Sequence, residues 1–539
     1  MRGVLSGRLS LLCTVAAPLL IALIACTAAG PGEGQAPQVP NKPTIELTIA
    51  LPQIVQGGNW DPSSGVKNIE REAGLVYESL FIHVPPSAEV RPYLLEGAAM
   101  SPDGLSWTLT LREGTRFSDG EPLTAADVKF SLERYISPAS RTPEVGTFRQ
   151  AIKELVVLDN RTLKVALNQS LITLPSLLAA NRSSEGIVVP KKHIDQVGWD
   201  SIAQRPMGSG AYKVTEYKVG DSVTFEAVEN HWRSSPRFAK VRVFQIPEER
   251  TRVAMIRSGQ ADLVSDIGPE GKKELEGNGL STIVVPNSYT WAGVFHGARQ
   301  EDPKNPLQNM AVREALNLAI DKKAVLDGLW AGAGELASFG PNAPFALGAP
   351  KDLKPTAYQP DRAKTLLQQA GYPDGFPLTI YTVNGLCPLG GDRRLGEVMA
   401  SYWEKIGIKA TLRPIEVTAY TPMYTRGQQI APELAGTIGV LCTSGTPVAI
   451  NDLTRVYWSK GRTKSTDLID TEIANAQTAR STEELVSRSQ TAYKKLYDTN
   501  SMLPIFWGSM IYGTNKKMGE VPITTGVNNL FQWLIQERR

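Results

Sequence analysis

One apolar segment near the start of the chain most constrains how the rest can fold. Arg2 and Arg8 precede an apolar run of about 15 residues, Leu11 to Ala25. A positively charged start followed by a short apolar core is typical of a secretory signal, and the run is too short for a comfortable membrane span. No second apolar run of about 20 residues follows it. We therefore expect the exported chain to fold without a transmembrane helix, outside the cytoplasmic membrane.

The apolar run closes in the sequence LIAC, which resembles the bacterial lipobox. The resemblance implies that residues 1–25 are a cleaved signal peptide and that Cys26 carries a lipid, in the periplasm or at the cell surface. An ordinary signal peptide or an uncleaved anchor is the alternative. Residues 26–43 are rich in Gly and Pro and carry little apolar surface, so they predict a flexible tether to a globule that starts near Thr44.

The charge balance argues against nucleic-acid binding. The chain has 57 Lys and Arg against 54 Asp and Glu, a formal net charge of +3, of which two positive charges leave with the signal. So small an excess is not typical of proteins that bind phosphate backbones by neutralising them. The roughly 500 remaining residues allow three or four domain-sized units. A hydrophobic content of 42% is ordinary for a globular protein.

The cysteines predict at most one disulfide in the mature chain. Cys13 leaves with the signal and Cys26 takes the lipid, so Cys387 and Cys442 remain. Two thiols outside the cell usually pair. A Cys387–Cys442 disulfide is therefore one expectation, and two buried free thiols are the other, since a sequence does not show whether two Cα atoms approach closely enough.

Hydrophobic periodicity predicts a mixture of strands and helices. Alternating apolar residues indicate strands at Ile45–Ile49, Trp107–Leu111, Val223–Glu226 and Ile408–Leu412. Helical spacing indicates helices that begin at Thr124 and that span Met310–Leu326, Asp361–Ala370 and Leu395–Ile406. Thr124 and Asp127 suit the first turn of their helix as capping residues. Helix-to-strand units in the second half are typical of an α/β lobe.

Six short runs follow one another in an order that identifies a family. They are WTLTLREGTRFSDGEPLTAADVKFSLER from Trp107, MGSGAYKV from Met207, ENHW from Glu229, IRSGQADL from Ile256, VREALNLAID from Val312 and DRAKTLLQQAGYPDGFPL from Asp361. With these runs the chain resembles the family 5 extracellular solute-binding proteins of ABC importers, the group of dipeptide, oligopeptide and nickel binders. The resemblance covers nearly all of the mature chain.

The resemblance implies a two-lobed α/β fold of the periplasmic-binding-protein type (type II, cluster C), with an additional subdomain in lobe one. Carried onto this chain, the basal part of lobe one comprises residues 44–72, 205–285 and 507–539. The additional subdomain comprises residues 73–204, and lobe two residues 286–506. The expected partners are a small-molecule solute, an ABC permease with its ATPase, and the membrane through the lipid, with the protein as a monomer.

Catalytic chemistry finds little support in the residues. The four histidines lack metal-ligand spacing and lie far apart, at His83, His193, His231 and His296. A G-x-S-x-G nucleophile motif is absent, and Gly208-Ser209-Gly210 fits a turn before a strand. We therefore expect a protein that is not an enzyme and needs no cofactor or metal.

Binding finds better support, because a solute held between lobes needs aromatic walls and a few polar groups. Segments that face the cleft in the family carry the aromatic candidates Trp60, Tyr289, Trp291, Tyr420, Tyr424 and Trp507. Ordinary core packing is an equally good explanation for any one of them.

The solute class depends on a departure from the family. Peptide-binding relatives carry an Asp that meets the peptide ammonium group, and Ser444 stands at that place here. Losing such a charge partner costs about 2–5 kcal/mol unless another acid replaces it. Asp452 is the nearby acid in the sequence, and Arg393 and Arg394 suit an anion instead.

The prediction is a solute-binding lipoprotein that delivers a peptide or peptide-like solute to its importer. An oligosaccharide or another neutral solute is the first alternative, since sugar rings stack on Trp and Tyr. A sensory or chaperone lipoprotein, or an extracellular hydrolase, would be a protein of another class.

Overall fold

An 11-stranded mixed sheet organises the fold. The computed structural model describes residues 45–537, apart from 56–58, 65–68, 85–88, 143–144, 181–183, 297–303, 343, 385–386, 417–418, 421–422, 424–430, 447, 458–468 and 519–534. The strands of the large sheet are β1 (Glu46–Leu51), β9 (Tyr212–Lys218), β10 (Ser222–Ala227), β12 (Lys240–Gln245), β13 (Leu263–Val264), β14 (Ser281–Phe295), β15 (Gly334–Leu336), β16 (Pro377–Asn384), β17 (Lys409–Glu416), β18 (Ile438–Thr443) and β19 (Leu503–Thr514).

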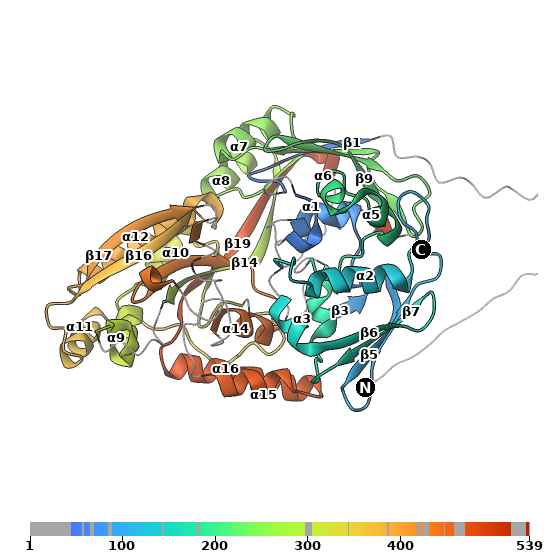
Figure 1. The fold of residues 1–539 in the computed structure, drawn as a ribbon. Coiled ribbons are helices and arrows are strands. Elements are labelled where there is room, and N and C mark those ends of the chain that lie inside the picture. The colour runs from blue at the N-terminus through green and yellow to red at the C-terminus, as the bar shows by residue number, and fades with distance from the viewer. Residues whose placement is uncertain are drawn as a thin grey trace, which may run out of the picture. The chain divides into compact units, whose positions relative to one another are not determined.

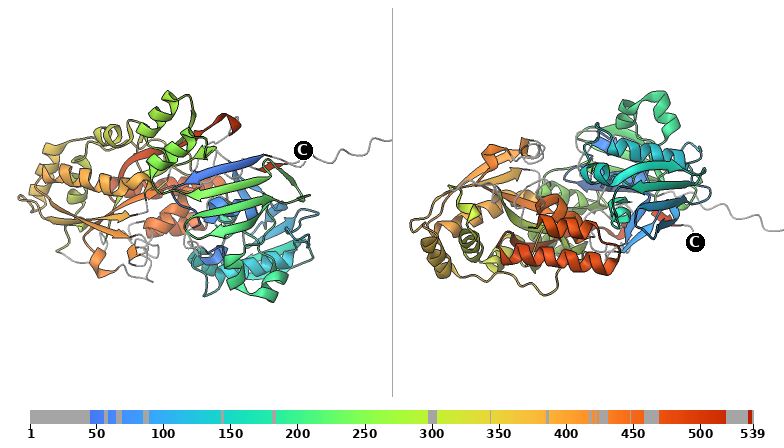
Figure 2. Two further views of the ribbon diagram at one scale, coloured as in Figure 1. Left: turned by 90° about the horizontal axis from the view of Figure 1, so that it is seen from above. Right: turned by 60° about the horizontal axis from the view of Figure 1, so that its bottom comes forward.

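Two long antiparallel strands, β14 and β19, join the halves of this sheet. On one side of the pair lie β18, β16 and β17, and on the other lie β13, β1, β12, β10 and β9 (Figure 1). The left view of Figure 2 shows β1, in blue, beside green strands, and β1 pairs in parallel with β12. The ladder between β14 and β19 is interrupted between Val285 and Tyr289, and Asn287 has a positive φ of 53° there. The ladder is therefore irregular at two points, this one near the middle of β14 and a second between Trp291 and Ala292.

Three smaller sheets accompany the large one. Their strands are β2 (Phe81–Val84), β3 (Glu89–Pro92) and β8 (Ala179–Ala180) in the first, β4 (Leu95–Met100), β5 (Ser106–Leu111), β6 (Ile152–Val157) and β7 (Thr162–Leu167) in the second, and β11 (Ser234–Pro236) and β20 (Ile535–Glu537) in the third. The second sheet is antiparallel and packs its apolar face around Trp107, Leu109 and Leu111, as their alternation predicts.

The helices lie between these strands along the chain. Their bounds are α1 (Ile69–Val76), α2 (Ala125–Ile136), α3 (Val145–Ala151), α4 (Leu174–Leu177), α5 (Lys191–Val197), α6 (Trp199–Gln204), α7 (Glu249–Arg257), α8 (Pro269–Gly277), α9 (Met310–Leu318), α10 (Lys322–Trp330), α11 (Pro360–Gln369), α12 (Gly391–Glu404), α14 (Ala449–Tyr457), α15 (Asp470–Gln477) and α16 (Thr482–Asp498). None of the helices in the described part of the chain combines the length and the apolar character needed to cross a bilayer.

The predicted strands are confirmed, and so are three of the four predicted helices. The helix that begins after Thr124 is α2, in which the Asp127 carboxylate accepts hydrogen bonds from the Thr124 amide at 2.9 Å and its hydroxyl at 2.7 Å. The prediction of one helix from Met310 to Leu326 is wrong, because the chain forms α9 and α10 there. Asp321 separates the two helices as the N-cap of α10, and its carboxylate accepts a hydrogen bond from the Ala324 amide.

Two of the six short runs, MGSGAYKV and ENHW, contribute close packing and polar contacts to the fold. A Cβ atom at Gly208 or Gly210 would overlap the backbone of Val76, so this turn requires glycine. In the ENHW run, Trp232 donates its indole N–H to buried Glu78 at 2.9 Å. The next residue, Arg233, forms an ion pair with the same carboxylate at 3.2 Å. These side chains tie together segments that lie far apart in the sequence.

Separate apolar cores fill the two halves of the large sheet. One surrounds β1 and β12 and includes Trp60, and the other surrounds β16 and α12 and includes Trp291. Tyr289 packs against both cores, next to the irregular point of β14. The α/β fold class is as predicted, while the residue boundaries of the lobes and of the additional subdomain stay predictions.

Candidate functional site

The carboxyl ends of three parallel strands form one edge of the large sheet. β16 pairs in parallel with both β17 and β18, and Asn384 at the end of β16 lies opposite Glu416 at the end of β17. The Asn384 amide donates a hydrogen bond to the Glu416 carboxylate at 2.9 Å. Ligands of open α/β sheets bind outside the carboxyl ends of the strands. This edge is therefore the place in this half of the fold where a binding site is expected.

A disulfide closes this edge. Cys387, which follows β16, is bonded to Cys442 near the end of β18, with a Cα–Cα distance of 5.2 Å across a sequence separation of 55 residues. Both residues are almost fully buried. The bond fixes the segment between β16 and α12 against the end of β18, and it joins the two cysteines that were expected to remain in the mature chain.

Trp291 packs beneath the start of α12. It lies on β14 opposite Cys442, is fully buried and stacks on Phe506 with ring centroids 5.3 Å apart. A Cβ atom at Gly391, the first residue of α12, would overlap the Trp291 ring. The glycine thus lets the helix start directly on the indole, and Trp291 acts as a core residue that supports the edge.

Asp392 is a buried acid in the first turn of α12. The residue is 1% exposed, and neither oxygen of its carboxylate has a hydrogen-bond partner within the described part of the chain. Burial raises the pKa of Asp392 to about 6; the nearby backbone amides of Asp392 and Arg393 lower it, and the charge of Glu416 adds to the rise. A buried carboxylate that is not paired with a cation is costly. The position therefore suits a group that brings positive charge.

The two basic residues after Asp392 lie on the solvent side of α12. Arg393 and Arg394 are both exposed, and Arg393 forms an ion pair at 2.9 Å with Glu397, one helical turn further on. The helix therefore buries the acid of this run and exposes its bases. Contact of either arginine with a bound anion stays a prediction.

Asp452 belongs to a buried hydrogen-bond network centred on Asn342. Its carboxylate, at 0% exposure, accepts hydrogen bonds from the Asn342 side chain at 2.6 Å and from the Thr446 amide. The Asn342 side chain also accepts a hydrogen bond from the Tyr493 hydroxyl, and its backbone carbonyl accepts one from the Trp507 indole at 2.9 Å. Asp452 thus holds α14 against the loop after β15, and Trp507 belongs to the same network.

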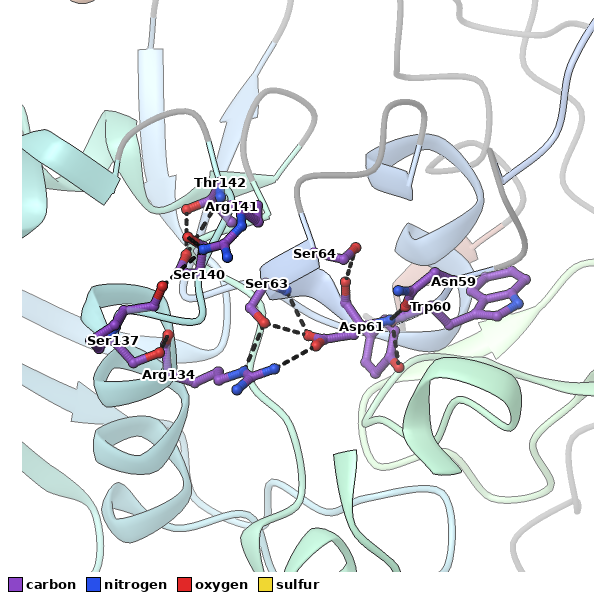
Figure 3. Close-up of polar contacts among 12 residues, drawn as sticks. Asn59, Trp60, Asp61, Ser63, Ser64, Arg134, Ser137, Ser140, Arg141 and Thr142 are labelled. Carbon is purple, nitrogen blue, oxygen red and sulfur yellow. Dashed lines mark hydrogen bonds and ion pairs between the residues drawn. The ribbon is translucent and has the colours of Figure 1, made fainter. Parts of the chain in front are cut away.

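Trp60 lies in a loop that is held by polar contacts of Asp61 and by aromatic packing of Trp60 itself. Figure 3 shows Ser63 and Arg134 on the same side of Asp61, and the Arg134 guanidinium is 3.0 Å from the Asp61 carboxylate and 2.8 Å from the Ser63 hydroxyl. The Trp60 indole is fully buried and meets Tyr217 edge-on, with ring centroids 5.6 Å apart. Like Trp291, it has no exposed surface in this structure, and its contact with a solute stays untested.

The other aromatic candidates differ in exposure. Tyr289 is half-buried, whereas Tyr420 is buried, with its hydroxyl 2.6 Å from Nε2 of His296. Burial lowers the pKa of His296 to about 4, so this imidazole stays neutral at physiological pH. Ser444 is half-buried just beyond β18. Tyr424 and the lipidation candidate Cys26 lie outside the described residues.

The structure brings some predicted residues together and adds two that the sequence reasoning missed. Trp291, Cys387 and Cys442 meet at the carboxyl edge, while Trp60 lies in the other core and Trp507 and Asp452 share the Asn342 network. Asp392 and Asn342 were missed. The acid directly before Arg393 was a signal for Asp392, and nothing in the sequence around Asn342 marks its role. Within the described ranges, no three His, Cys, Asp or Glu side chains gather closely enough to hold a metal ion.

Comparison with known proteins gives a family match over most of the chain. Residues 89–465 match the family model for bacterial extracellular solute-binding proteins, family 5 (middle region). Heme-binding protein A of Haemophilus influenzae is 26% identical over 401 residues, which cover 70% of each chain. The glutathione-binding protein GsiB of Salmonella typhimurium is 29% identical over 307 residues, so the chain spans only 58% of that relative's length.

A solved structure shares the fold. The periplasmic binding protein DppA of Helicobacter pylori, in complex with the peptide STSA, matches with a TM-score of 0.76 and 22% identity, over 92% of this chain and 99% of DppA. At that identity the likeness shows the fold, and it confirms the predicted α/β architecture of periplasmic binding proteins.

Proposed function

Since the chain belongs to the bacterial extracellular solute-binding proteins of family 5, we propose that it captures a peptide or peptide-like solute and delivers it to the permease of an ABC importer. The observation that carries the proposal is the family match, which spans well over half of the 539 residues. The relatives are named as binding proteins, so no catalytic role is proposed.

The peptide class rests on two of the three relatives compared. DppA holds the peptide STSA, and GsiB is named for glutathione, itself a small peptide, whereas the Haemophilus protein is named for heme. Ser444 in place of a carboxylate favours a neutral solute such as an oligosaccharide. A buried carboxylate elsewhere at the carboxyl edge, Asp392, favours a solute with a positive charge.

Capture is proposed to work by closure of the two halves of the fold on the solute. The strands β14 and β19 connect these halves, and the irregular point between Val285 and Tyr289 is where such a pair bends most readily. A solute that contacts both halves shifts the population toward a closed form. Small-angle scattering is expected to show a smaller radius of gyration with bound solute, and an unchanged radius would contradict closure.

Anchoring by a lipid on Cys26 is part of the same proposal. The chain then acts outside the cytoplasmic membrane, tethered near its permease and the ATPase of the importer. Mass spectrometry of the membrane-extracted protein is expected to find a diacylglyceryl group on an N-terminal Cys26. A Cys26→Ser variant is expected to be released from membranes, and membrane retention of that variant would contradict a lipid anchor.

The solute class is tested by native mass spectrometry of residues 27–539, followed by denaturation and identification of whatever is released. Isothermal titration with short-peptide and oligosaccharide libraries then measures affinity. Peptide masses or peptide binding support the proposal. A hexose-spaced mass series, or binding of oligosaccharides alone, would replace the peptide by a sugar and leave the importer role standing.

A further inference from the structure

We propose that Asp392 binds a cationic group of the solute, an ammonium or a guanidinium, at the carboxyl edge of β16, β17 and β18. The inference rests on the proposed function and specifies which solutes the site accepts. It does not depend on the position occupied by Ser444, where peptide-binding relatives carry their acid.

The first argument is the state of the Asp392 carboxylate. Among the described residues, it is the only carboxylate with both oxygens buried and without a hydrogen bond of normal geometry, although the backbone amides of Asp392 and Arg393 lie near enough to lower its pKa. Buried charges in proteins are normally paired, because a charge in a medium of low dielectric is strongly disfavoured without a partner. A buried carboxylate that the folded chain does not pair with a cation is expected to receive that cation from a ligand.

The second argument is the place of Asp392 in the fold. The residue is the second of α12, at the edge where three parallel strands end, which is where open α/β sheets bind ligands. The Cys387–Cys442 disulfide and the contact of Gly391 with Trp291 hold this helix start in position. A rigid support of this kind is what a binding carboxylate requires.

The third argument is the charge around Asp392. Burial is the main cause of the raised pKa of Asp392, the backbone amides of Asp392 and Arg393 lower it, and the charge of Glu416 at the end of β17 adds to the rise. Glu416 therefore places a second negative charge near Asp392, which a cation would offset. Arg393 and Arg394 face solvent, and Arg393 is paired with Glu397, so neither neutralises the buried acid. Asp452 is unsuited to the same task because Asn342 and Thr446 already donate to it.

The test compares Asp392→Asn with Asp361→Asn. Asp361 occupies the equivalent second position of α11 but is exposed, so it is a matched control. Titration uses four probes: short peptides with a free amino terminus and no basic residue, the same peptides N-acetylated, N-acetylated peptides with one Arg or Lys, and neutral oligosaccharides. The wild-type protein is expected to bind a cationic set and to reject the acetylated neutral set.

The expected loss in Asp392→Asn is at least about 30-fold in affinity for the cationic set, the equivalent of about 2 kcal/mol for a truncated buried charge pair. Asp361→Asn is expected to bind like the wild type. Without solute, Asp392→Asn is expected to melt at a higher temperature, because a buried unpaired charge is removed. Weaker binding together with a more stable free protein is a pattern that a purely structural residue does not produce.

Asp392→Glu is the second variant, since it keeps the charge and moves it by one methylene. It is expected to keep the preference for cationic peptides at reduced affinity. Unchanged cation binding by Asp392→Asn, or equal losses for all probes with a lower melting temperature, would overturn the inference and leave the importer function intact. Binding of neutral oligosaccharides alone would also overturn it. If no probe binds and no solute co-purifies, both the solute-binding function and the role of Asp392 would be contradicted.

Discussion

Replacing Lys322 by Met is expected to stabilise this protein by several kcal/mol near neutral pH. Lys322 is the first residue of α10, is 3% exposed, and its ammonium group has no hydrogen-bond partner among the described residues. It lies at the positive end of the helix, which disfavours a cation further. Burial lowers the pKa of Lys322 from 10.5 to about 7.

The magnitude follows from proton linkage. The pKa in the folded state is below that of the unfolded chain, so between pH 7 and pH 10.5 the unfolded chain binds more protons, and stability rises with pH. At about 1.4 kcal/mol per pKa unit, and with the folded-state amine half-deprotonated at pH 7, the buried amine costs about 4 kcal/mol at pH 7 and about 2 kcal/mol at pH 9. Methionine keeps the unbranched aliphatic stem and carries no charge.

The assay is denaturant unfolding of the wild type, Lys322→Met and Lys323→Met at pH 7, 8 and 9. Lys323 is the matched control, since its side chain is 65% exposed and paired with Asp327 on the same helix. That variant is expected to stay within about 0.5 kcal/mol of the wild type. A Lys322→Met protein that is less stable than the wild type, or equally stabilised at pH 7 and pH 9, would refute the reasoning.

Three further predictions concern the supports of the site. Reducing the disulfide, which spans 55 residues, is expected to lower the free energy of unfolding by about 4 kcal/mol by the chain-entropy estimate, measured by denaturant titration with and without reductant. Gly391→Ala is expected to lower the free energy of unfolding by about 1–3 kcal/mol, because the added Cβ overlaps Trp291. Gly146→Ala in α3, where the space is open, is the control and is expected to be neutral or stabilising by up to about 1 kcal/mol. Equal changes in melting temperature for the two variants would argue against the overlap. Asn342→Ala is expected to cost about 3 kcal/mol by removing one of the donors to the buried Asp452 carboxylate, and a melting temperature like that of the wild type would show that this hydrogen bond does not contribute to stability.

Local patterns were enough to predict the fold class and, of the eight strands and helices expected, all except the single helix over Met310–Leu326. Alternation in Trp107–Leu111 predicted β5, and the capping residues Thr124 and Asp127 predicted the start of α2. These features depend on neighbours in the sequence, so they can be recognised without a structure. The error at α9 and α10 has the opposite cause: apolar spacing continues through the break, and the Asp321 cap was overlooked.

The candidate site was less predictable, because it depends on which face of an element is buried. In Gly391-Asp392-Arg393-Arg394 the sequence presents an acid and two bases, and the arginines were expected to meet a solute. Successive residues of a helix point about 100° apart, so the packing of α12 on its sheet decides which of them enter the interior. That packing buries Asp392 and exposes both arginines.

By itself, the sequence determined the family, the α/β fold class and seven of the eight strands and helices that were predicted from it, since these follow from short runs and local periodicity. Tertiary structure alone decided that Asp452 is bound to Asn342, more than 100 positions earlier in the chain, and that the Asp392 carboxylate is buried without a partner among the described residues. The physical reason is that pairing of a buried polar group depends on contacts between distant segments, which only the folded chain brings together.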